Sequence, residues 1–111
     1  MEKAYRVKKS AEIEFIMKNK SSVGDGSFVI YKLVKKDETH FRFAISVPKK
    51  YGNAVERNLM KRRIREIVRS NHFLDGLDFF IIVKPKAKEL NFQEVKIDLE
   101  KLFARAKINK G

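Results

Sequence analysis

The spacing of apolar side chains predicts four strands. Residues 27–35 (SFVIYKLVK) and 41–47 alternate between apolar and polar or small side chains, which is typical of strands with one buried face. Residues 78–84 (DFFIIVK) are apolar almost throughout, which indicates a central strand buried on both faces. Residues 21–23 form a candidate edge strand before a Gly-Asp-Gly turn. Because residues 36–39 are polar and few, we expect a hairpin between the first two long strands.

The alternation also predicts which side chains share a face of the sheet. Tyr31 falls on the face opposite Phe28, and Ala44 and Ser46 fall on the face opposite Phe43. Small or polar side chains at positions 44 and 46 would leave room for a ligand beside Tyr31. A half-buried core position for Tyr31 is the alternative interpretation.

The strongest helix signal lies in residues 54–70, which contain no Pro or Gly. Asn53 can cap the first turn, and Glu56 occupies the capping-box position three residues later. At about 100° per residue, the apolar side chains form one stripe: Met60, Ile64, Ile67 and Val68. Beside the stripe lies a strip of polar and basic residues, here called the basic strip: Arg57, Asn58, Lys61, Arg62, Arg65 and Arg69.

The basic strip destabilises an isolated helix. Like charges four residues apart cost a few tenths of a kcal/mol per pair, and Lys61, Arg65 and Arg69 follow that spacing. A polyanion lying along the strip would remove the repulsion. A solvated face of a basic protein is the alternative.

Two further helices are predicted near the ends of the chain. Ser10 can cap a short helix over residues 11–18, and Asn91 can cap one from Phe92 to about residue 107. Residues 107–111 are predicted to fray. The element order α-β-β-β-α-β-α predicts an α+β fold, a two-layer sandwich with a small mixed sheet. At this length we expect one domain over residues 1–111.

Charge narrows the class of partner. The formal net charge is +12, from 26 Lys and Arg against 14 Asp and Glu, which favours nucleic acid or an anionic membrane. The basic helix lacks the aromatic anchors of a membrane-surface helix, and the longest apolar run, residues 79–83, is far short of a span of about 20 residues. We therefore expect no membrane partner. The chain has no Cys, which suits a cytoplasmic protein.

No catalytic or metal-binding constellation is present in the sequence. His40 and His72 are isolated, and the acidic residues are scattered among basic ones without the spacing of a metal site or an acid–base pair. The Gly-Asp-Gly turn lacks the length and the Lys of a phosphate loop. We expect neither catalytic residues nor metal ligands in this chain.

Residues 46–66, SVPKKYGNAVERNLMKRRIRE, resemble the signature of the protein subunit of bacterial ribonuclease P. The RNR motif of that family reads R-N-x-x-K-R-x-x-R. Its counterparts here are Arg57, Asn58, Lys61, Arg62 and Arg65, preceded by Lys49, Lys50, Gly52, Asn53, Ala54 and Val55. The predicted elements follow the order of the family as well, so the resemblance covers nearly the whole chain.

The resemblance implies a subunit of an enzyme whose catalytic centre is in RNA. The catalytic RNA of ribonuclease P, with Mg²⁺ held by that RNA and the substrate, would remove the 5′ leader from precursor tRNA. The protein would bind the RNA subunit through a set of residues on and before the basic helix: Lys49, Lys50, Asn53, Arg57, Asn58, Lys61, Arg62, Arg65 and Arg69. The family also implies a left-handed β-α-β crossover, where general rules predict a right-handed one. A holoenzyme with more than one copy is compatible with it.

A second site is implied between the first helix and the sheet, where the single-stranded leader would lie. Its residues are Arg6, Lys8, Lys9, Ile13, Met17, Tyr31 and Ser46. The family usually has aromatic residues where this chain has Ile13 and Met17, so the resemblance implies an apolar contact there and leaves base stacking open. Ordinary core packing of the short helix is the alternative for these two residues.

Two other functions remain open from the residues alone. A ribosomal or general RNA-binding protein would have the same size and charge, although it would not require the RNR motif. A DNA-binding helix-turn-helix domain would place residues 54–70 in the major groove. Several strands and the lack of a paired preceding helix argue against that, so we expect no DNA partner.

Overall fold

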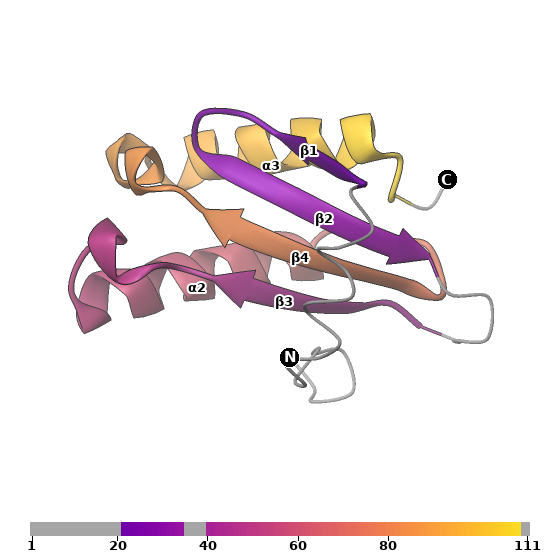
Figure 1. Ribbon diagram of the computed structural model, residues 1–111, viewed down its shortest axis with the longest axis horizontal. Coiled ribbons are helices and arrows are strands. Elements are labelled where there is room, and N and C mark those ends of the chain that lie inside the picture. Colours follow the sequence, from indigo (N-terminus) through magenta and orange to yellow (C-terminus); the bar gives the residue numbers. More distant parts are fainter. Residues whose placement is uncertain (1–20, 35–39, 110–111) are drawn as a thin grey trace.

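The computed structural model describes residues 21–34 and 40–109, which form an α+β fold around one mixed sheet (Figure 1). The four strands are β1 (Ser22–Gly24), β2 (Phe28–Val34), β3 (Arg42–Ser46) and β4 (Leu77–Val83). Their order in the sheet is β1-β2-β4-β3, and β4 pairs antiparallel with β2 and parallel with β3. The predicted fold class is confirmed. The predicted first helix, residues 11–18, lies outside the described residues.

The predicted hairpin between β2 and β3 is wrong, because β4 lies between these two strands. Tyr31 of β2 is paired with Phe80 of β4, and Phe80 is paired in turn with Ala44 of β3. A polar connection of a few residues shows only that the chain leaves one strand and enters another. The partner of each strand is set by burial, and the nearly continuous apolar run of β4 is best buried at the centre of the sheet.

Helices α2 (Ala54–Arg69) and α3 (Phe92–Ala106) pack on the same face of this sheet (Figure 1). Phe79 of β4, Ile64 of α2 and Phe103 of α3 are all 0% exposed and belong to one core. Phe73, from the loop after α2, stacks edge-on against Phe103 with ring centroids 5.0 Å apart. The sheet and the two helices therefore form one core, which holds α2 in a fixed orientation.

Both helices begin at a capping box. Asn53 Oδ1 accepts a hydrogen bond from the Glu56 amide at 2.9 Å, and Glu56 Oε1 accepts one from the Asn53 amide at 3.0 Å. Asn91 and Glu94 repeat this geometry at the start of α3. The caps predicted at Asn53 and Asn91 are confirmed. Each such cap is worth about 1 kcal/mol, and together they fix where the helices start.

The chain after each parallel strand forms a short 3-10 helix. β3 is followed by η2 (Lys49–Tyr51), which leads into α2, and β4 is followed by η3 (Pro85–Glu89). The two 3-10 helices lie against each other beside the start of α2. The crossover β3-α2-β4 joins neighbouring parallel strands, and its left-handed sense remains a prediction.

The prediction that the tail frays from residue 107 is wrong for residues 107–109. Ile108 is 0% exposed, and its carbonyl accepts a hydrogen bond from the Leu74 amide at 3.0 Å. Asn109 forms a β-bridge with Phe73. Lys107 turns the chain in the left-handed region, at φ 57°, so that Ile108 reaches the core. The burial of Ile108, its hydrogen bond with Leu74 and the bridge at Asn109 together hold this segment.

Candidate nucleic-acid interface

The buried side of α2 is the apolar stripe predicted from the helical period. Met60, Ile64, Ile67 and Val68 are each at most 1% exposed. Burying side chains of this size contributes about 1.5–3 kcal/mol each. Rotation of α2 about its axis would expose them, so their burial determines which way the basic strip faces.

The basic strip lies along the side of α2 that the core leaves accessible. The residues predicted to bind RNA fall into two groups by exposure. The exposed ones are Lys49, Lys50, Asn53, Asn58, Arg62 and Arg69, and the half-buried ones are Arg57, Lys61 and Arg65. Helix α2, its N-cap residue Asn53 and the 3-10 helix before it therefore carry all nine.

Two cations of the basic strip have no carboxylate partner among the described residues. Within the described part of the chain, Lys61 and Arg62 make no ion pair. Arg69 lies 3.8 Å from Glu66, but both side chains are at least 60% exposed, and such surface pairs contribute about 0–1 kcal/mol. Lys61, Arg62 and Arg69 are thus accessible to an external anion.

Two predicted residues have part of their side chain engaged in the fold. Asn53 Oδ1 is the cap acceptor of α2, which leaves its amide nitrogen for a partner. Arg57 Nε is enclosed without a hydrogen-bond partner among the described residues. Part of its side chain therefore packs against the protein, and Arg57 as a whole is half-buried.

The face of the sheet opposite the helices holds the described part of the predicted leader cleft. Tyr31 and Ser46 are both half-buried on this face, as the alternation predicted. They are not neighbours, however, because Phe80 and Ile82 of β4 separate them. Tyr31, Phe80 and Ile82 form a small apolar cluster with Leu33 and Ala44. The room predicted beside Tyr31 is therefore occupied by Phe80.

An ion pair between β3 and β4 lies at one end of that face. Arg42 donates two hydrogen bonds to Asp78, at 2.7 and 3.1 Å, and Asp78 is 1% exposed. In the sheet, Asp78 of β4 is paired with Arg42 of β3 on one side and with Leu33 of β2 on the other. Neither residue had been singled out, because they are 36 positions apart in the sequence and become neighbours only through the pairing of β3 with β4.

The other predicted leader contacts, at Arg6, Lys8, Lys9, Ile13 and Met17, lie outside the described residues. In the part that the structure describes, no group of three or more His, Asp or Glu side chains could hold a metal ion. No helix of that part is long and apolar enough to cross a bilayer.

Comparison with known proteins assigns the family. A profile of the family described as Ribonuclease P matches residues 1–107. The chain belongs to the ribonuclease P protein family. It is 45% identical to the ribonuclease P protein component of Phytoplasma australiense, over 95% of this chain and 93% of the relative. The counterpart in Acholeplasma laidlawii is 42% identical over 97% and 94%.

Solved structures of ribonuclease P proteins share this fold. The Staphylococcus aureus RNase P protein superposes with a TM-score of 0.89 at 41% identity, covering 97% of this chain and 100% of that one. The Thermotoga maritima RNase P protein, solved with 1-(4-fluorophenyl)-2-thiourea, gives a TM-score of 0.81 at 29% identity over 90% and 98%. The resemblance predicted from the RNR motif is thus confirmed at the level of family and fold.

Proposed function

We propose that this chain is the RNA-binding protein subunit of a ribonuclease P holoenzyme, which removes the 5′ leader from precursor tRNA in the cytoplasm. The observation that carries the proposal is the basic strip, in which Lys61 and Arg62 have no ion-pair partner among the described residues and project from a helix fixed by its apolar stripe and its cap. Family membership supports the same conclusion. The catalytic centre belongs to the RNA subunit, and the protein contributes binding.

The basic strip binds the RNA subunit through phosphates. Lys61 and Arg62 lie next to each other on one turn of α2 and have no carboxylate partner among the described residues. Each phosphate contact releases counterions, which gives a steep dependence of affinity on salt. Asn58, which is exposed on the same strip, adds hydrogen bonds to sugar or base edges.

The face of the sheet opposite the helices binds the single-stranded leader. Tyr31 offers a half-buried aromatic ring there, and stacking of a base on such a ring is worth about 1–3 kcal/mol. The apolar cluster around Phe80 extends this surface toward Ser46. Because an aromatic ring stacks on any base, a site of this kind accepts leaders of different sequence.

In this proposal the RNA subunit and the substrate hold the Mg²⁺ ions. The described residues offer no cluster of three metal-ligating side chains. The formal net charge of +12 instead lowers the repulsion between two polyanions, the RNA subunit and the precursor. The magnesium concentration needed for cleavage is therefore expected to fall when the protein is present.

The test is reconstitution. The chain is mixed with ribonuclease P RNA and precursor tRNA at physiological magnesium, and release of the 5′ leader is measured against the RNA alone. We expect faster cleavage with the chain. The competing function, a ribosomal or general RNA-binding protein, predicts binding without any gain in cleavage, and that result would reject the proposal.

A further inference from the structure

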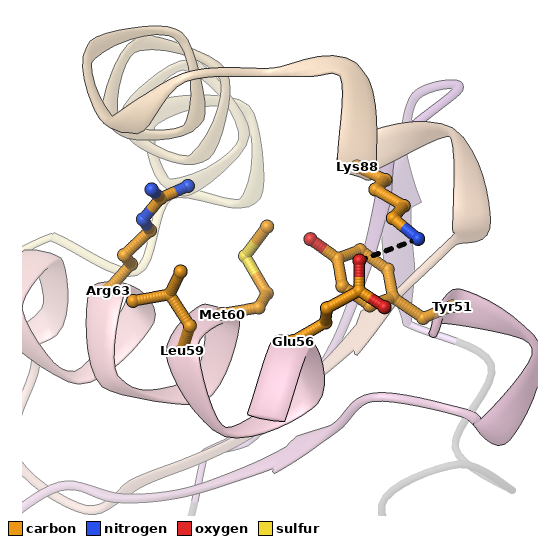
Figure 2. Close-up of a pocket in the computed structure, with 6 residues that line it drawn as sticks. All are labelled: Tyr51, Glu56, Leu59, Met60, Arg63 and Lys88. Carbon is orange, nitrogen blue, oxygen red and sulfur yellow. Dashed lines mark ion pairs between the residues drawn. The ribbon is translucent and has the colours of Figure 1, made fainter. Parts of the chain in front are cut away.

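A hollow of about 210 Å³ lies on the other flank of α2, away from the basic strip (Figure 2). Residues of α2, η2 and η3 line it, and none of them was predicted to bind RNA. These residues are Tyr51, Glu56, Leu59, Met60, Arg63 and Lys88. At about 100° per residue, Arg63 is roughly 160° around α2 from Lys61, on the far side of the apolar stripe. The hollow is thus a separate surface.

The hollow combines an apolar floor with two cations. Met60 is 1% exposed and Leu59 is 44% exposed, so the floor is apolar and reachable from solvent. Figure 2 shows Arg63 and Lys88 on opposite sides, with Met60 and the Tyr51 ring between them. Arg63 makes no ion pair with the described residues, whereas Lys88 lies 2.7 Å from Glu56.

Tyr51 brings a polar group into this space. Its side chain is 6% exposed, yet its hydroxyl points into the hollow and has no hydrogen-bond partner among the described residues (Figure 2). Burial raises the pKa of Tyr51, and the nearby charges of Arg63 and Lys88 partly oppose the rise. At neutral pH the hydroxyl therefore stays protonated and can donate to a ligand.

Size and charge identify the ligand class. Pockets for drug-sized molecules span about 300–1,000 Å³ and bury most of the ligand, so this smaller, open hollow suits one ring of a larger partner. The adjoining 3-10 helices add exposed Lys49, Lys50 and Lys86 against a single acid, Glu89. An apolar floor surrounded by positive charge complements a nucleotide within an RNA strand. Its base can lie against the floor, and the phosphates on either side of its sugar can meet the cations.

We propose that this hollow binds one nucleotide of the RNA subunit, with the ring against Leu59 and Met60 and the flanking phosphates toward Arg63 and Lys88. The inference rests on the proposed function. A helix with its side chains is about 10–12 Å across, so RNA docked on the basic strip can extend over α2 to its other flank. The RNA would then hold α2 from two sides.

Glu56 limits this site because its carboxylate holds Lys88. Gln at position 56 would keep the capping box, since its amide oxygen can accept from the Asn53 amide as Glu56 does. It would release Lys88 from the ion pair. Glu56→Gln is therefore expected to tighten RNA binding at low salt. The gain should exceed that from removing an exposed acid remote from the hollow, which changes only the net charge.

The test measures the affinity of the full chain for ribonuclease P RNA over a series of salt concentrations. Arg63→Gln and Lys88→Gln each remove one charge at the hollow, and Arg62→Gln removes one from the basic strip. Lys101→Gln is the matched control, since Lys101 is exposed on α3 and does not line the hollow. Thermal melts of every variant verify that the fold is intact.

We expect Arg63→Gln and Lys88→Gln each to lower the salt slope by about 0.7–0.9, as loss of one phosphate contact does, while Lys101→Gln leaves it unchanged. If both hollow variants behave like Lys101→Gln while Arg62→Gln lowers the slope, the hollow is not an RNA site and the proposed function stands. If the wild-type chain does not bind this RNA more tightly than an unrelated RNA of equal length, both proposals fall.

Discussion

Replacing Lys61 and Arg62 with Gln removes two neighbouring charges from the basic strip without altering the fold. Neither side chain pairs with a carboxylate in the described part of the chain, so no ion pair within that part is broken. Gln has nearly the helix propensity of Lys and Arg, and the buried stripe of α2 is unchanged. The midpoint of thermal unfolding should therefore stay at its wild-type value.

The expected effect on RNA binding follows from counterion release. Each lost phosphate contact lowers the slope of log affinity against log salt by about 0.7–0.9, so two contacts lower it by about 1.4–1.8. Between about 50 and 200 mM salt, the wild-type chain should lose about 7–12 times more affinity than the double variant. At low salt the double variant should bind more weakly than the wild type.

The assay is a binding titration with ribonuclease P RNA at several salt concentrations. The matched control is Lys96→Gln with Lys101→Gln, which removes the same net charge from α3. A double variant of the strip with the slope of the wild type, or a control with the same reduction, would refute the assignment of the strip as the docking surface.

The remaining predictions concern the leader site, the buried ion pair and pH. Tyr31→Ala should weaken binding of leader-bearing precursor by about 1–3 kcal/mol and leave mature tRNA unchanged, while Tyr31→Phe keeps the ring and should bind normally; equal losses for both RNAs would make Tyr31 a core residue only. Arg42→Met leaves the Asp78 carboxylate without its bidentate partner and should cost about 3–5 kcal/mol in urea unfolding. Adding Asp78→Leu should recover much of that loss, and a loss that persists in the double variant would contradict this account. The pKa of Glu56 is lowered from 4.5 by its hydrogen bonds to Lys88 and to the Asn53 amide. Its contribution to stability is therefore complete above the unfolded-state pKa and lost as the pH falls through the lower folded-state pKa. Thermal melts between neutral and acidic pH should show a smaller acid-induced drop for Glu56→Gln than for the wild type, and identical drops would exclude this ion pair as a source of stability.

Local signals in the sequence were sufficient for α2. Its start at Asn53 depends on residues three apart, and its buried stripe depends on the helical period, so both could be predicted without knowledge of the rest of the fold. The faces of β2 and β3 were predictable for the same reason, because the alternation along a strand is local. The side of α2 on which the basic strip lies followed from the start of the helix and from its buried stripe.

Strand order and the hollow depend on contacts between distant residues. Phe80 separates Tyr31 from Ala44 because β4, the most apolar strand, lies at the centre of the sheet. The residues of the turns do not indicate which strand takes the central position. Tyr51 and Lys88 line one hollow only because β3 and β4 are parallel, so that the chain after each strand emerges at the same edge. The burial of Ile108 could not be predicted from its neighbours in the sequence, because it depends on core residues from distant parts of the chain.

The most direct test of RNA docking on α2 is lysine footprinting of the native chain. Reactivity of each lysine toward an acylating reagent is measured by mass spectrometry, with and without ribonuclease P RNA. We predict that Lys49, Lys50 and Lys61 become protected while Lys101 on α3 keeps its reactivity. If Lys61 reacts equally in the free and bound chain, α2 does not lie against the RNA, and the central claim is contradicted.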